Sequence, residues 1–93
     1  MAEERAGFRV TGVVQGVGFR WWTRRKGFEL GLRGAVANLS DGSVEAHVAG
    51  APEAIVAFER ALAQGPSGAR VSSVQRVMSR LTIPFQGFEI AHG

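Results

Sequence analysis

The sequence predicts an α/β (α+β) sandwich, in which two helices pack on one face of an antiparallel sheet. The 93 residues are enough for one small domain with a single hydrophobic core. Apolar residues alternate with polar ones in the segments expected to be strands, and they recur at helical spacing in two other segments. The order is strand, helix, strand, strand, helix, strand and a short last strand. We therefore treat residues 1–93 as a single domain.

The first strand is expected over residues 7–13, where the alternation has a period of two. The first helix is expected over residues 21–30, and Gly31 fits the left-handed residue that often follows a helix. Gly27 inside this helix should cost about 1 kcal/mol relative to alanine. Close packing of the helix on the sheet is the expected reason for this glycine.

The start of the first helix carries two tryptophans and a short basic run. Trp21 and Trp22 are expected to pack in the core or at its rim. Arg24, Arg25 and Lys26 are expected on the solvated face, where they raise the local positive potential.

The second and third strands form a predicted hairpin. They are expected over residues 34–39 and 44–48, and residues 40–43 between them read Ser-Asp-Gly-Ser, a hairpin turn signal. The third strand alternates, so one of its faces is expected to be buried and the other wet. Glu45 and His47 lie on the face predicted to be wet, and we expect this histidine to be solvated.

The second half of the chain repeats the helix-and-strand pattern. A second helix begins near Pro52 and ends at residues 65–66, and a fourth strand follows over residues 70–78. The imperfect alternation of valines in that strand predicts a bulge. The short last strand carries Phe88 and Ile90 on one face. The doubled unit predicts a ferredoxin-like βαββαβ sandwich with both helices on one face of the sheet.

Composition narrows the class of protein. The chain is 45% hydrophobic and 20% charged, as in globular domains, and its net charge of +3 is too small to indicate nucleic-acid binding. The sequence contains no cysteine, which excludes disulfides and cysteine metal sites. No apolar signal region or membrane-spanning stretch is apparent. We expect a soluble cytoplasmic monomer that uses no metal or cofactor.

The most informative stretch is the strand-to-helix loop at residues 14–20, Val-Gln-Gly-Val-Gly-Phe-Arg. Its two glycines permit a tight loop that directs several backbone N–H groups to one point. The following helix adds unpaired N–H groups and the positive end of its dipole. Arg20 would be unfavourable there unless an anion lies between it and the N–H groups. The loop predicts an anion site, with a solvated arginine in a glycine turn as the alternative.

Two other glycine motifs are excluded. A P-loop requires Lys followed by Ser or Thr after its second glycine, where this chain has Phe19 and Arg20. A dinucleotide fingerprint requires a small residue at the position of Trp21, and it requires a longer chain.

Three segments resemble the acylphosphatase family. Residues 12–20 are similar to its phosphate-loop signature, residues 30–38 to its second signature, and residues 87–90 to its last strand. The resemblance covers the chain in order, and the two signatures together are specific. It implies hydrolysis of the carboxyl–phosphate bond of acyl phosphates to a carboxylate and inorganic phosphate, without a cofactor.

The resemblance also implies roles for individual residues. Arg20 would bind the phosphoryl oxygens, Asn38 would hold the attacking water, and Thr23 would support the loop and helix. The backbone N–H groups that would bind the phosphate are those of Gln15, Gly16, Val17, Gly18, Phe19 and Arg20. Two positions depart from the family pattern, since Ala35 stands where many members have tryptophan and Gly27 where many have alanine. Both departures concern packing more than chemistry.

Two other functions are weighed against this one. Small sandwiches of this topology also bind RNA, but they stack bases on aromatic residues of the middle strands, and the third strand here has none. The second is a non-catalytic anion-binding or regulatory acylphosphatase-like module. Intact Arg20 and Asn38 argue against that module, and the sequence leaves it open.

Overall fold

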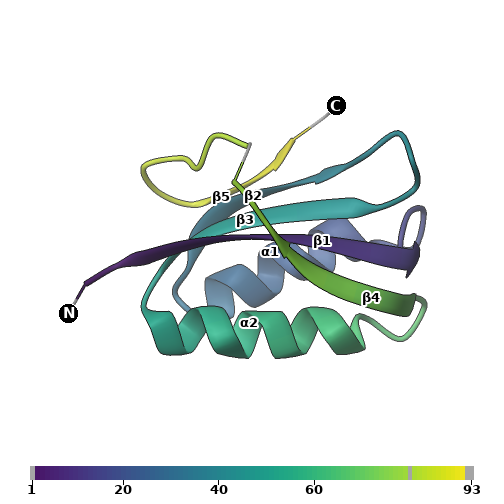
Figure 1. Cartoon of the computed structure of the whole chain (residues 1–93), viewed down its shortest axis with the longest axis horizontal. Coiled ribbons are helices and arrows are strands. Elements are labelled where there is room, and N and C mark those ends of the chain that lie inside the picture. Colours follow the sequence, from purple (N-terminus) through teal and green to yellow (C-terminus); the bar gives the residue numbers. More distant parts are fainter. Residues whose placement is uncertain (1, 80, 92–93) are drawn as a thin grey trace.

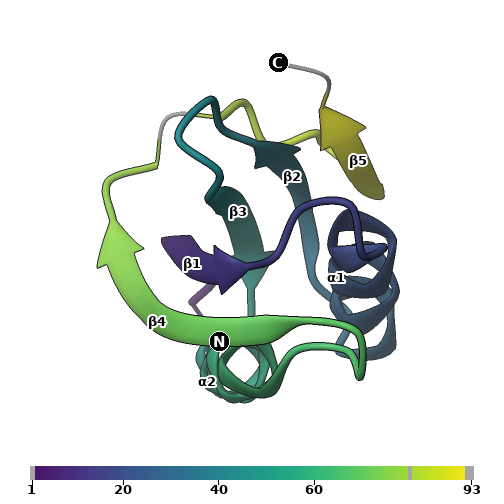
Figure 2. The same ribbon diagram turned by 90° about the vertical axis from the view of Figure 1, so that its right-hand side faces the viewer.

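The computed structural model describes residues 2–79 and 81–91 and has the predicted order of elements. The strands are β1 (Glu4–Val13), β2 (Arg33–Asn38), β3 (Val44–Gly50), β4 (Arg70–Val77) and β5 (Phe88–Ala91), and the helices are α1 (Phe19–Glu29) and α2 (Pro52–Gln64). The sheet has the strand order β4-β1-β3-β2-β5. Both helices cover the same face of the sheet (Figure 1 and Figure 2). The predicted ferredoxin-like sandwich is confirmed.

The pairing of the strands adds one feature to the predicted antiparallel sheet. The pairs β1 with β3, β1 with β4 and β2 with β3 are antiparallel, whereas β5 is parallel to β2. β4 and β5 lie at opposite edges, so the chain between them has to cross the sheet. The short last strand therefore makes the sheet mixed.

The predicted bulge is present in β4. Thr11 lies opposite Ser73 and Gly12 lies opposite Val71, so Ser72 is the extra residue. Gly12 has φ = 126°, and a Cβ there would lie 2.1 Å from a backbone oxygen of β4. The bulge therefore requires glycine at this position of β1.

The core lies between the sheet and the two helices. A row of aromatic rings connects them, because the Phe58 ring on α2 lies 5.9 Å from that of Phe8 on β1 and 6.3 Å from that of Phe88 on β5. All three side chains are buried. Removing such a side chain from water stabilises a fold by about 1.5–3 kcal/mol.

The other face of the sheet is not wet, and the prediction for Glu45 and His47 was wrong. These residues are 2% and 0% exposed, respectively. His47 Nε2 lies 3.0 Å from Glu45 Oε1, and Arg9 Nε lies 3.6 Å from Glu45 Oε2. The connection from β4 to β5 runs over this face (Figure 1), and its Ile83 is buried. The crossing connection removes from water a face that would be open in a simpler sandwich.

α1 begins at Phe19, two residues earlier than predicted, and packs closely on the sheet through Gly27. Thr23 and Gly27 are buried on its inner face. A Cβ on Gly27 would lie 2.3 Å from Cε2 of Phe88. The predicted close packing is confirmed, since no larger side chain fits between this helix and β5 without a shift.

Replacing Gly27 with alanine tests this packing. Alanine favours a helix by about 1 kcal/mol, but overpacking a core costs about 1–3 kcal/mol and usually more than that gain. We expect Gly27→Ala to lower the free energy of unfolding by about 1–2 kcal/mol in urea denaturation. The change should be smaller when Phe88→Leu is also present. A single variant as stable as the wild type would show that the Phe88 ring moves aside freely.

Candidate active site

The loop between β1 and α1 has the geometry of an anion cradle. Gly16 and Gly18 both have φ = 75°, a left-handed conformation that other residues rarely adopt. Val14 and Phe19, at the two ends of the loop, are each 1% exposed and anchor it to the core. The loop is therefore a shaped, anchored segment.

The N–H groups along this loop are free to bind a ligand. Within residues 2–79 and 81–91, those of residues 15–20 donate no hydrogen bond. The first turn of α1 also contains no acidic residue. N–H groups at a helix N-terminus without a nearby carboxylate attract anions.

The side chain of Gln15 has a role that the sequence analysis missed. Its Nε2 donates hydrogen bonds of 2.8 Å to the Leu39 carbonyl and 2.9 Å to the Ser43 carbonyl. These acceptors lie 24 and 28 residues further along the chain, so no local pattern indicates the bonds. The side chain thus fastens the loop to the turn between β2 and β3.

The turn between β2 and β3 is itself well held. The Leu39 N–H donates to the Ser43 carbonyl, and Gly42, with φ = 94°, donates to the Leu39 carbonyl. Asp41 Oδ1 accepts bonds of 2.6 Å and 2.9 Å from the hydroxyl and the N–H of Ser43. These bonds, with a smaller contribution from Arg9, hold the pKa of Asp41 below its usual range. The predicted hairpin turn is confirmed, and it offers Gln15 a fixed partner.

Asn38 is the last residue of β2 and directly precedes this turn. It lies opposite Val44, the first residue of β3. Its Oδ1 is buried, and no hydrogen-bond donor among the described residues reaches it. A buried amide oxygen without a partner is unfavourable, so it is a strong acceptor for a small donor such as water. The two bonds of Gln15 bring the loop to this end of β2.

Arg20 stands in the first turn of α1. Its side chain is half-buried and makes no ion pair with the described carboxylates. It lines a hollow of about 430 Å³ that lies next to β5. The position, directly after the cradle, is the one that an arginine clamp requires.

Thr23 lies deeper than the other predicted site residues. It is fully buried, and its Oγ1 finds no partner in the described part of the chain. Unlike Asn38, which is half-buried, Thr23 has no exposed part, so this placement fits a supporting role. That role stays a prediction.

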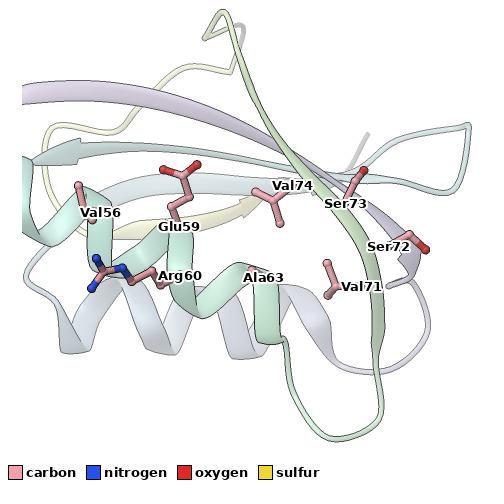
Figure 3. A pocket seen from close by; sticks show the side chains of 8 residues that line it. All are labelled: Val56, Glu59, Arg60, Ala63, Val71, Ser72, Ser73 and Val74. Carbon is pink, nitrogen blue, oxygen red and sulfur yellow. The ribbon is translucent and has the colours of Figure 1, made fainter.

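A hollow larger than the one beside Arg20 lies elsewhere on the described surface. It measures about 530 Å³ and opens between α2 and β4 (Figure 3). Its walls carry no residue of the predicted site, and they are formed by Val56, Glu59, Arg60, Ala63, Val71, Ser72, Ser73 and Val74. Volume alone therefore does not identify the site.

Two further properties concern the described residues only. Across residues 2–79 and 81–91, no three His, Cys, Asp or Glu side chains are grouped closely enough to hold a metal ion. In that same part of the chain, neither helix has the length and apolar character needed to cross a membrane.

The fold and the loop define a small ferredoxin-like domain with an anion-binding segment between its first strand and first helix. The family model described as Acylphosphatase matches residues 6–90. The chain therefore belongs to the acylphosphatase family, as its two signatures predicted.

Named relatives agree with this assignment. An acylphosphatase of Rhizobium etli is 51% identical over 73 residues, which is 78% of each chain. An acylphosphatase of Vibrio cholerae is 43% identical over 90 residues, covering 97% of this chain and 99% of the relative. The structure of an acylphosphatase from Coxiella burnetii superposes with a TM-score of 0.85 at 36% identity, covering 96% of this chain and 93% of that one.

Removing the Gln15 side chain should loosen the site. Gln15→Ala removes one of the two donors from each of the Leu39 and Ser43 carbonyls, and each such bond contributes about 0.5–1.5 kcal/mol. We expect a loss of about 1–2 kcal/mol in the free energy of unfolding, measured in urea. The control is Gln64→Ala, because Gln64 is exposed at the end of α2 and its loss should change stability by less than about 0.5 kcal/mol. Equal effects of the two changes would contradict a tie between the loop and the turn.

Proposed function

We infer that this protein is an acylphosphatase, a hydrolase that cleaves the carboxyl–phosphate anhydride of a small acyl phosphate to a carboxylate and inorganic phosphate. One observation carries the mechanism. The cradle with its free N–H groups and Arg20 is fastened by Gln15 to the strand end that presents the unpaired Oδ1 of Asn38. Membership of the family supports the reaction, and the roles of the single residues are our proposal.

In this mechanism the cradle and Arg20 bind the phosphoryl group. The loop N–H groups of residues 15–20 donate to its oxygens, and the guanidinium forms a two-pronged contact with them. Phosphoryl transfer depends mainly on positioning and on stabilising the charge of the equatorial oxygens. These donors are fixed by the loop before the substrate binds, so little reorganisation is needed.

Asn38 orients the attacking water. Its Oδ1 accepts a hydrogen bond from the water, while its amide nitrogen can donate one. An amide does not remove a proton near neutral pH, so the proton passes to a phosphoryl oxygen of the substrate itself. The leaving carboxylate is stable as an anion, and the reaction therefore needs no strong general acid.

The buried histidine does not supply the missing acid or base. His47 lies in the middle of β3, opposite Gly7 and Ala35, on the face that the crossing connection covers. That face is the one turned away from α1. The site is therefore formed from an arginine, an amide and backbone groups. The monomeric state and the cytoplasmic location stay predictions.

Arg20 should be the most sensitive residue. Arginine clamps in phosphoryl transfer contribute about 10³–10⁵ in rate, so Arg20→Ala should lower kcat/KM for benzoyl phosphate by that order and weaken binding of inorganic phosphate. Arg20→Lys should recover little, because an ammonium cannot form the planar two-pronged contact. The measurement follows the ultraviolet absorbance of benzoyl phosphate in the presence of a chelator. Arg60→Ala, an exposed arginine beside the other hollow, is the matched control and should remain active.

Replacing Asn38 should lower turnover without weakening the binding of phosphate. We expect Asn38→Ala to lower kcat by about 10²-fold, because a misplaced nucleophile loses its alignment. The affinity for inorganic phosphate, measured by calorimetry, should stay close to that of the wild type. Equal loss of phosphate affinity in Asn38→Ala and Arg20→Ala would contradict the division of roles. Folded wild type that binds phosphate but hydrolyses no acyl phosphate would instead identify a non-catalytic anion-binding module.

A further inference from the structure

A hollow of about 430 Å³ lies between the start of α1 and β5, and Arg20 is one of the residues that line it. Figure 2 shows β5 next to α1, and the hollow lies between these two elements. Its walls are formed by Arg20, Trp21, Arg24 and residues 88–90. Since Arg20 is part of the wall, a group attached to a phosphate held by Arg20 can extend directly into this hollow. In an acyl phosphate, that group is the acyl group.

Trp21 gives the hollow an apolar wall. Its side chain is 67% exposed, although the neighbouring Phe19 is buried and Trp22 packs against the core. It also borders a second hollow of about 450 Å³ that it shares with Gly18 of the cradle. An exposed indole next to a cleft offers a planar surface on which an unsaturated or aromatic group can stack.

Arg24 supplies a cation held in place, and the prediction that it is simply solvated was wrong. Its Nε donates a 2.9 Å hydrogen bond to the Phe88 carbonyl. Its guanidinium carbon lies 4.8 Å from the centre of the Phe28 ring and 5.8 Å from that of Trp21. None of the described carboxylates forms an ion pair with it. A guanidinium that is already ordered loses little further freedom when it binds an anion.

One carboxylate lines the same hollow. Glu89 lies on β5, is exposed, and forms no ion pair with Arg20 or Arg24 within the described part of the chain. Its charge opposes the binding of an anion nearby. A second negative group is favoured only where it contacts the Arg24 guanidinium directly.

We propose that this hollow is the acyl-group subsite, in which Trp21 stacks against the acyl group and Arg24 pairs with a carboxylate at its far end. The proposal rests on the acylphosphatase function inferred above and adds a substrate class to it. The favoured substrates are acyl phosphates whose acyl group is planar and ends in a carboxylate. Arg24 follows Arg20 by four positions along α1, a rise of about 6 Å, and a para-substituted benzene ring spans such a distance.

The test compares acetyl phosphate, benzoyl phosphate and 4-carboxybenzoyl phosphate, each corrected for its uncatalysed hydrolysis. Acetyl phosphate is too short to reach Arg24, and the para-carboxylate cannot cyclise onto the phosphate. For the wild type, kcat/KM should be about threefold to tenfold higher for 4-carboxybenzoyl than for benzoyl phosphate, as for a partly exposed charge pair. Glu89→Gln should raise this preference further, because it removes the opposing charge.

Variants of the helix locate the source of the preference. Arg24→Gln should remove it, so that the two benzoyl substrates are hydrolysed with equal kcat/KM. Arg24→Lys should keep part of it, since the charge remains. The matched control is Arg25→Gln, which removes the same charge at the next position of the helix. Arg25 lines the hollow of about 450 Å³ and not the proposed subsite, so this variant should keep the full preference. Trp21→Ala should raise KM for both benzoyl substrates by about threefold to tenfold, and Trp21→Phe should restore it.

The outcomes separate the two levels of the proposal. The subsite would be overturned if the wild type showed no preference for 4-carboxybenzoyl phosphate, or if Arg24→Gln and Arg25→Gln lowered that preference equally. Turnover of acetyl phosphate by the wild type would still uphold the acylphosphatase function in either case. Folded wild type without acetyl phosphate turnover would overturn that function and the subsite with it. Circular dichroism of each variant excludes loss of folding as the cause.

Discussion

The site depends on the two hydrogen bonds that the Gln15 carboxamide donates to the carbonyls of the turn between β2 and β3. Left-handed glycines shape the loop, and the start of α1 adds N–H groups, but both concern only the phosphate half of the site. The half that we propose to hold the water belongs to a different segment, at the end of β2. The two bonds join these halves at a fixed distance. A small change in that distance would misplace the water relative to the phosphoryl group and lower the rate.

The order of the strands makes this connection possible. β3 lies between β1 and β2 and is antiparallel to both, with Val44 opposite Val10 on one side and opposite Asn38 on the other. The end of β1, the end of β2 and the start of β3 therefore lie at the same end of the sheet. The loop leaves β1 at this end, so a single glutamine side chain is long enough to reach the neighbouring turn.

The sequence was sufficient for features that depend on neighbouring residues and insufficient for those that depend on distant ones. Element order and a bulge in β4 follow from periodicity and local propensity, and the structure confirms them. A glycine inside a helix likewise indicates close packing, although its partner, Phe88, is not visible in a local pattern. The burial of Glu45 depends on an aperiodic connection that crosses the sheet. The anchor of Arg24 is a carbonyl 64 residues further along the chain. No local pattern encodes a contact of that kind.

The chemistry of the groups explains why so much of the structure serves to hold the site. Guanidinium groups stay charged at physiological pH, and backbone N–H groups and amides do not exchange protons with substrate there. A site made of such groups cannot adjust its reactivity through proton transfer, so its effect on the rate comes from where its donors and acceptors stand. Three features fix those positions: the buried anchors Val14 and Phe19, the left-handed glycines of the loop, and the hydrogen bonds of Gln15. Rigidity at this end of the sheet is therefore part of the mechanism that we propose.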